Sequence, residues 1–219
     1  MSSASQGPSP SSLARQLWLA NHQLAQRCLE HPFVQGLALG TLLRAVFAGY
    51  VAQDACFLES FARAYALAIA HSPDRDSLIA FNALLQGVLQ ELELHAGYAQ
   101  RWGIDLEAIT PLAATSAYTD FLMATARGGD AGLICAAMTP CLRLYAWLGQ
   151  QLRAQVGHPG HAYADWIDTY ADPAFEALAC RLEDLLNRLA EPSAETERIY
   201  GRAMELEIGF FDAHATTGA

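Results

Sequence analysis

The chain has 219 residues, of which 53% are hydrophobic and only 16% are charged. A folded domain of this length buries roughly 70–75% of the surface that its unfolded chain exposes, so a sizeable core is available. The low charge and high apolar content argue against a chain that is disordered as a whole. All 13 basic residues are Arg, and the missing Lys excludes mechanisms that need a phosphate-binding or Schiff-base lysine. The formal net charge is −10 and the arginines are scattered, so nucleic acid and anionic lipid are poor partners.

Helical periodicity dominates the sequence, and strand-like alternation is almost absent. We expect a polar, disordered tail over residues 1–11 and one all-α domain over residues 12–219, a bundle of about eight helices. His31-Pro32 is expected to end the first helix, Gly36 and Gly40 to lie in a loop, and Thr41 to cap the second helix. In chain order, the expected helices cover residues 13–29, 42–71, 75–101, 116–127, 131–156, 161–171, 173–190 and 193–214.

The five cysteines give information on the cellular compartment and on a possible nucleophile. The count is odd and no pair has CxxC spacing, so a disulfide framework or a zinc knuckle is not expected. No apolar run approaches the ~18 residues of a membrane span, and the tail lacks a signal-peptide pattern. We therefore expect a cytoplasmic protein without a membrane partner. One cysteine can be a nucleophile among Cys28, Cys56, Cys135, Cys141 and Cys180.

An acidic residue interrupts an aromatic stripe on the second helix. Tyr50, Asp54, Phe57 and Phe61 recur at helical spacing and share one face. A carboxylate on such a stripe is informative, because its burial is costly unless it is paired. The alternative is a solvated Asp54 at the edge of the stripe.

A second candidate lies at an expected kink. Pro140 lacks a backbone N–H and should bend its helix. Cys141 and Tyr145 follow on one face, four residues apart. This pattern fits an activated thiol beside a phenol, but it also fits an inert buried cysteine.

Two further acidic patterns leave alternatives open. Glu205 and Glu207 lie about 200° apart around the last helix, so only one can face the core. Glu91 and His95 are four residues apart, which fits either a pair of metal ligands or an exposed ion pair.

Four stretches together resemble the TenA family of thiaminase II and aminopyrimidine aminohydrolases. They are HPFVQGLALGTL (31–42), YVAQDACFLESFARAYALA (50–68), Ser116–Asp120 with PCLRLYAWLG (140–149), and HAYADWIDTYADPAF (161–175) followed by ELEIGFFDAH (205–214). The resemblance implies a heme-oxygenase-like helical fold, a homotetramer and no cofactor. It also implies hydrolysis at the 5-substituent of a 4-amino-2-methylpyrimidine. The substrate would be the aminomethyl pyrimidine, releasing ammonia and the hydroxymethyl pyrimidine, or thiamin itself.

The resemblance also implies roles for individual residues. Cys141 matches the nucleophile, and Glu207 matches an acid beside one ring nitrogen. Asp54 matches the carboxylate that binds the amino group and the adjacent ring nitrogen. The matching aromatic residues of the pocket are Phe57, Tyr118, Tyr145 and Tyr170. Position 57 is Tyr in some members, so activity on intact thiamin stays open, and Arg143 stands where the family often has an aromatic residue.

Two other classes of function remain as alternatives. A metal-dependent oxidase or oxygenase on the same scaffold would draw its ligands from Glu91, His95, Glu207 and His214, whose spacings do not form a complete set. A non-catalytic, pyrimidine-binding regulator is the other, although the acidic charge and the lack of a helix-turn-helix pattern oppose direct DNA binding.

Overall fold

The computed structural model describes residues 12–104, 109–158 and 160–215, so the expected tail lies outside the described residues. Within these ranges the chain is all-α, as predicted. Its helices are α1 (Leu13–Ala20), α2 (His22–Leu29), α3 (Pro32–Leu39), α4 (Arg44–Ala70), α5 (Arg75–Trp102), α6 (Ala113–Arg127), α7 (Ala131–Val156), α8 (Ala164–Tyr170), α9 (Pro173–Leu189) and α10 (Ala194–Ala215).

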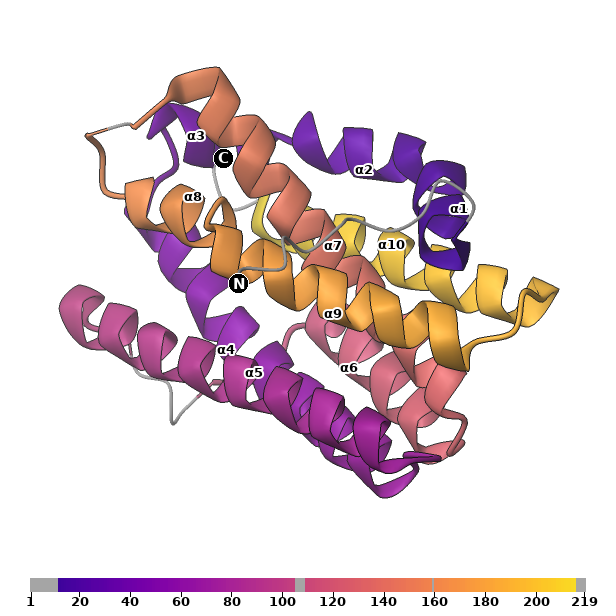
Figure 1. Cartoon of the computed structure of the whole chain (residues 1–219). Helices are drawn as coiled ribbons and strands as arrows, with labels where there is room; N and C mark the ends of the chain where they lie inside the picture. Colours follow the sequence, from indigo (N-terminus) through magenta and orange to yellow (C-terminus); the bar gives the residue numbers. More distant parts are fainter. Residues whose placement is uncertain (1–11, 105–108, 159, 216–219) are drawn as a thin grey trace, which may run out of the picture.

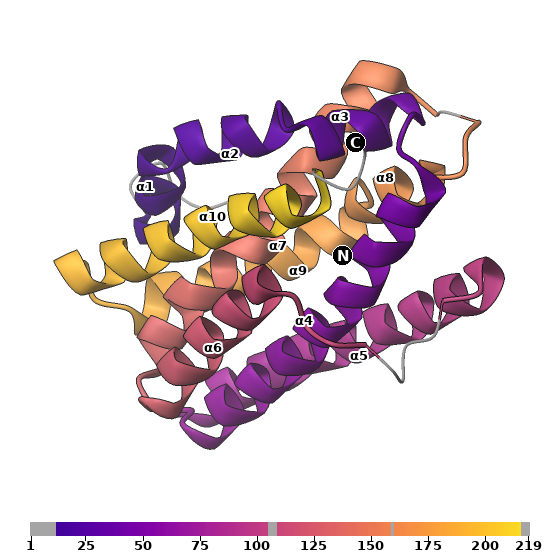
Figure 2. The same ribbon diagram turned by 180° about the vertical axis from the view of Figure 1, so that it is seen from behind.

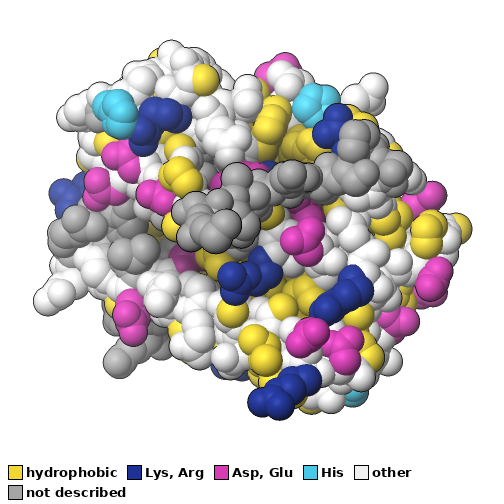
Figure 3. Space-filling model, viewed as in Figure 1, with side chains coloured by type: hydrophobic (Ala, Val, Ile, Leu, Met, Phe, Trp, Pro, Cys, Tyr) yellow, Lys and Arg dark blue, Asp and Glu magenta, His cyan; other side chains and the backbone are white. Residues whose placement is uncertain are grey.

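Helix α7 is the central element of the bundle. It packs against α9 on one side and α10 on the other, and it also touches α6 and α8 (Figures 1 and 2). The hairpin of α4 and α5 lies alongside, with α6 against α4. On the face shown in Figure 3, basic and acidic side chains are interspersed rather than segregated. The long helices therefore meet around α7, where their apolar faces form the core.

Length and composition alone would allow α7 to cross a membrane, and the bent pair of α3 and α4 passes the same test. In α7, 72% of the apolar window is buried inside the protein. The apolar surface of α7 is thus used in packing against its neighbours, as expected for the core helix of a bundle.

The described residues form ten helices rather than about eight, and both extra helices lie before residue 40. Asn21 divides the expected first helix, because its side-chain amide donates to the Leu17 carbonyl at 2.9 Å and competes with the backbone ladder. Residues 32–39 form α3 instead of a loop. His31 Nδ1 accepts from the Phe33 N–H at 3.2 Å, and Pro32 occupies the first turn, where its missing N–H costs nothing.

The start of the second predicted helix moves for a related reason. Gly40 takes a left-handed φ of 69°, and Thr41 N donates to the Gly36 carbonyl at 2.9 Å. Together they end α3 in the manner of a Schellman motif. Thr41 therefore closes one helix rather than capping the next, and α4 begins at Arg44.

Helix α6 begins at Ala113, three residues earlier than predicted. A buried side chain of α4 supplies the cap that the local sequence lacks. Gln53 Oε1 accepts from Leu112 N at 2.8 Å and from the Thr115 hydroxyl at 2.6 Å. The start of α6 is thus set by a tertiary contact.

Candidate active site

A small enclosed cavity lies where the face of α7 that bears Cys141 meets the neighbouring helices. Its volume is about 20 Å³, enough for about one water molecule, so lining side chains must move when a ring-sized ligand enters. The lining side chains come from α4, α5, α7, α8 and α9: Asp54, Phe57, Leu58, Phe61, Glu91, Cys141, Leu142, Tyr145, Tyr170 and Phe175. Five of the seven predicted site residues are in this set.

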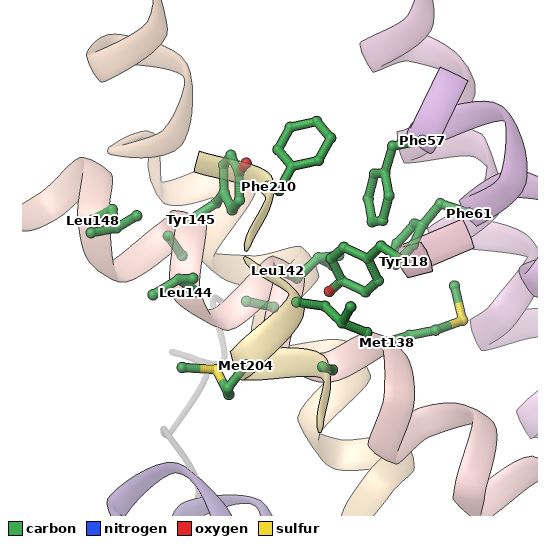
Figure 4. Close-up of a cluster of buried hydrophobic side chains, with 14 of the residues drawn as sticks. Phe57, Phe61, Tyr118, Met138, Leu142, Leu144, Tyr145, Leu148, Met204 and Phe210 are labelled. Carbon is green, nitrogen blue, oxygen red and sulfur yellow. The ribbon is translucent and has the colours of Figure 1, made fainter. Parts of the chain in front are cut away.

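The other two predicted residues, Tyr118 and Glu207, adjoin the cavity from α6 and α10. The Tyr118 hydroxyl donates to Glu207 Oε1 at 2.7 Å. The Cys141 side chain lies close enough to Glu207 for each group to shift the pKa of the other. The rings of Tyr118 and Phe57 lie 4.7 Å apart. Figure 4 shows Phe57, Tyr118, Tyr145 and Phe210 converging from four helices. All seven predicted residues are therefore brought together.

Of Glu205 and Glu207 in the last helix, Glu207 faces the core and Glu205 faces solvent. The pKa of Glu207 is raised from 4.5 to about 8. Burial is the main cause and the nearby Asp54 carboxylate adds to it, while the hydrogen bond from Tyr118 and the nearby Cys141 side chain act in the opposite direction. Glu207 therefore carries a proton at neutral pH and can donate it.

The thiol of Cys141 is also neutral in the resting site. Burial raises its pKa well above the ordinary value, and the carboxyl groups of Glu207, Glu91 and Asp54 raise it further. Among the described side chains that line the cavity, none is Arg or His, so no cation offsets these acids. A thiolate is therefore not preformed, and the thiol must lose its proton as it reacts.

Aromatic side chains hold the remaining wall in place. The Tyr50 hydroxyl donates to Tyr145 at 3.2 Å and accepts from Trp166 Nε1 at 3.3 Å. The ring of Tyr170 lies 4.9 Å from that of Tyr145 and 4.6 Å from that of Trp166. Burial raises the pKa of Tyr145 and of Tyr170, so both stay neutral phenols able to donate hydrogen bonds.

Five of the ten lining residues were not predicted as site residues: Leu58, Phe61, Glu91, Leu142 and Phe175. Glu91 was predicted only as a candidate metal ligand, and Phe175 only as part of a stretch that resembles the family. The carboxylate of Glu91 accepts from the Tyr170 hydroxyl at 2.7 Å, across 79 positions of sequence. No local spacing could have revealed this pairing, although Glu91 lies on the same helical face as the buried Leu84 and Val88.

The candidate metal ligands do not gather. Glu91 lines the cavity and Glu207 lies near Cys141, whereas the buried His214 packs against the rings of Tyr50 and Phe210. The side chain of His95 lies outside the described residues. Among the side chains that are described, no three His, Cys, Asp or Glu come close enough to share a metal ion.

The fold and the site together define an all-helical protein with a thiol and a carboxylic acid paired in an aromatic cavity. The sequence profile of the TENA/THI-4/PQQC family matches residues 19–217, and the chain belongs to this family. The predicted resemblance is thereby confirmed.

Individual relatives agree with this assignment. The chain is 34% identical over 209 residues to the aminopyrimidine aminohydrolase of Halalkalibacterium halodurans, covering 91% of this chain and 90% of that protein. It is 35% identical over 231 residues to the mitochondrial bifunctional TH2 protein of Arabidopsis thaliana, covering 94% of this chain but 37% of that protein. The chain therefore spans little more than a third of the Arabidopsis relative.

A solved structure confirms the fold. A TenA family transcription regulator from Silicibacter sp. superposes with a TM-score of 0.87 at 30% identity, covering 94% of this chain and 98% of that chain. The order and packing of the helices are thus those of the family.

Proposed function

We propose that this protein hydrolyses the bond at the 5-methylene of a 4-amino-2-methylpyrimidine, converting the aminomethyl compound to the hydroxymethyl compound and ammonia. The observation that carries the proposal is Cys141 in an aromatic cavity beside Glu207, whose pKa is raised to about 8 and which accepts a hydrogen bond from Tyr118. The chain is a hydrolase of its family, which follows from its relatives named aminopyrimidine aminohydrolase. The residue roles given below are part of the proposal.

The cavity offers a flat, electron-poor ring what it needs for binding. The rings of Phe57 and Tyr145 supply apolar faces for stacking. Asp54 accepts from the exocyclic amino group, and Glu207 donates to a ring nitrogen. These contacts orient the ring so that the carbon beside that nitrogen faces Cys141.

The first step adds the thiol across the carbon–nitrogen double bond of the ring. Glu207 gives its proton to the ring nitrogen and takes the proton of Cys141, while the sulfur forms a bond to the adjacent carbon. The carboxyl group ends in the state in which it began, so no free thiolate is required. This route suits a site in which both groups are neutral at rest.

The second step breaks the bond to the leaving group. The electron pair of the exocyclic amino group moves into the ring, an exocyclic methylene forms, and the protonated amine departs as ammonia with the electrons of its bond. Positive charge then develops on the amino nitrogen, where the Asp54 carboxylate stabilises it. Water adds its hydroxyl to the methylene and its second proton converts ammonia to ammonium, and the sulfur leaves as the ring nitrogen returns its proton through Glu207 to the thiol.

The proposal is tested by ammonia release from the aminomethyl pyrimidine. The Cys141→Ser variant should lose activity by about 10³-fold or more, because a hydroxyl is a much weaker nucleophile, while the fold is retained. The matched control is Cys56→Ser, because Cys56 is half-buried on α4 and does not line the cavity. Full activity of Cys141→Ser would refute the covalent route.

A further inference from the structure

A much larger cavity lies beside the small one that contains Cys141. This cleft has a volume of about 690 Å³ and runs between α5 and the start of α9, which pack side by side (Figure 1). Glu91 and Phe175 line both the cleft and the small cavity, so their side chains form the partition between the two. The exposed side chains of Gln86 and Gln90 also line the cleft and lie at its rim.

The partition is the side of the small cavity that solvent approaches. Seven of the ten lining residues are buried: Asp54, Phe57, Leu58, Phe61, Leu142, Tyr145 and Tyr170. The other three, Glu91, Cys141 and Phe175, each keep part of their surface accessible. Because Glu91 and Phe175 also line the cleft, the accessible side of the small cavity faces the cleft.

The two residues of the partition are held in different ways. The Tyr170 hydroxyl donates to Glu91 Oε1 at 2.7 Å, which fixes the carboxyl group. Phe175 meets the ring of Tyr170 edge-on, with the ring centroids 4.9 Å apart. A contact between two rings is less directional than a hydrogen bond, so Phe175 is the part of the partition that moves more easily.

The backbone under Phe175 is anchored while its ring is free to turn. Phe175 lies in the first turn of α9, where Asp172 Oδ1 accepts from Ala174 N at 2.7 Å and the Asp172 carbonyl accepts from Phe175 N at 3.0 Å. A rotation of the half-buried ring toward the cleft therefore leaves the helix start intact, and the cleft has the room to receive it. The same rotation enlarges the small cavity, whose 20 Å³ holds no ring-sized ligand.

We propose that the cleft is the entrance to the small cavity, and that the ring of Phe175 is a gate whose outward rotation sets the size of the molecules that reach Cys141. Phe175 is in this sense a specificity-determining residue that acts on access. The inference goes beyond the proposed function, because it concerns the route to the thiol and not the reaction that follows. It can therefore be tested without any pyrimidine.

The test measures how fast Cys141 reacts with two neutral maleimides, N-methylmaleimide and the bulkier N-phenylmaleimide. In both reactions the sulfur adds to the maleimide double bond and a proton ends on the neighbouring carbon, so both depend equally on ionisation of the thiol. The ratio of the phenyl rate to the methyl rate then reports on size. Mass spectrometry of the peptide that contains Cys141 separates its label from labels on the half-buried Cys56 and Cys180.

Phe175→Ala should raise this ratio about tenfold, because the closed arrangement of the gate no longer limits the bulkier reagent. Gln86→Trp places a large ring at the rim of the cleft and should lower the ratio below that of the parent. The matched control is Leu89→Trp, which adds the same ring at an exposed position of α5 that does not line the cleft, and should leave the ratio unchanged.

Circular dichroism confirms that each variant is folded before it is labelled. A ratio that stays at the parent value in both Phe175→Ala and Gln86→Trp would show that Cys141 is reached from another side, and would overturn the inference. If Phe175→Ala does not fold, the comparison of Gln86→Trp with Leu89→Trp decides: equal ratios in these two variants overturn the entrance.

Discussion

Two buried clusters of charged and polar groups lie two residues apart on α7, and they are built in opposite ways. On one face, Cys141 meets the carboxyl groups of Asp54, Glu91 and Glu207. On the other, Arg143 Nε and Nη2 donate to both oxygens of Glu183 at 2.7 Å, and Nη1 donates to Glu176 at 2.8 Å. Burial lowers the pKa of Arg143, but the hydrogen bonds to these two glutamates outweigh it and raise the pKa overall.

The cluster around Arg143 stabilises the fold, whereas the cluster around Cys141 is suited to proton transfer. The arginine cluster joins α7 to α9 with its buried charges paired and hydrogen-bonded, so it has little tendency to exchange protons. In the thiol cavity, acids lie together with no cation among the described lining residues, and protons stay on groups that would otherwise ionise. Uncompensated burial thus creates the proton donor that the proposed chemistry uses.

Arg143 links α7 to α9. Its guanidinium pairs with Glu176 and Glu183 on α9. Only 13% of its side-chain surface is exposed. Arg143 therefore adds a buried ionic link between two helices and is not among the residues that line the cavity.

The largest expected effect is on activity, from neutralising the proton donor. Glu207→Gln should lower kcat by about 10²–10⁴-fold, because the amide cannot exchange protons with the ring nitrogen or the thiol. The matched control is Glu205→Gln, an exposed glutamate of the same helix that pairs with Arg202 at 3.0 Å. Activity in Glu207→Gln equal to that of the control would contradict the proton relay.

The same variant should be more stable than the parent at alkaline pH. Folding raises the pKa of Glu207 from 4.5 to about 8, so its contribution is full below pH 4.5 and is lost as the pH rises to about 8. The quantity compared is the free energy of unfolding of Glu207→Gln minus that of the parent. This difference should be larger at pH 9 than at pH 5, by about 2–4 kcal/mol. Urea denaturation at the two pH values measures this difference, and a constant difference would rule out the raised pKa.

Removing Arg143 should leave the carboxylates of Glu176 and Glu183 without their cation. Arg143→Met should therefore lower the free energy of unfolding by about 3–5 kcal/mol. Neutralising the partners as well, in the triple variant with Glu176→Gln and Glu183→Gln, should recover much of that loss. Chemical denaturation of the single and triple variants checks this prediction, and a single variant as stable as the parent would contradict it.

The smallest expected effect comes from one hydroxyl group. Tyr118→Phe removes the hydrogen-bond donor to Glu207, which raises the pKa of Glu207 above about 8. The alkaline limb of the plot of rate against pH therefore moves to higher pH. We expect a loss in kcat of about tenfold, on the scale of one hydrogen bond to a reacting group. Tyr65→Phe is the control, since that buried hydroxyl has no hydrogen-bond partner among the described residues. An unmoved alkaline limb in Tyr118→Phe would show that the hydrogen bond does not tune Glu207.

Local signals predicted most helices because their causes lie within a few residues. Asp74 and Asp130 cap α5 and α7 through hydrogen bonds to backbone N–H groups three residues on, at 2.7 and 2.9 Å. Pro140 lies inside α7 as predicted. The errors lie where a distant side chain or a competing local bond decides the boundary, as Gln53 does for α6 and Asn21 for α1.

For the site, helical spacing predicted that a thiol, acids and phenols lie on the faces of amphipathic helices, since it sets which residues share a face. Spacing alone could not decide between Glu205 and Glu207, because both positions are compatible with the helix, and only the family resemblance favoured Glu207. Only the tertiary structure places Glu207 beside Tyr118 and Cys141, Glu91 beside Tyr170, and Arg143 between two glutamates. A pKa shift is a property of the environment, and that environment comes from helices far apart in the chain.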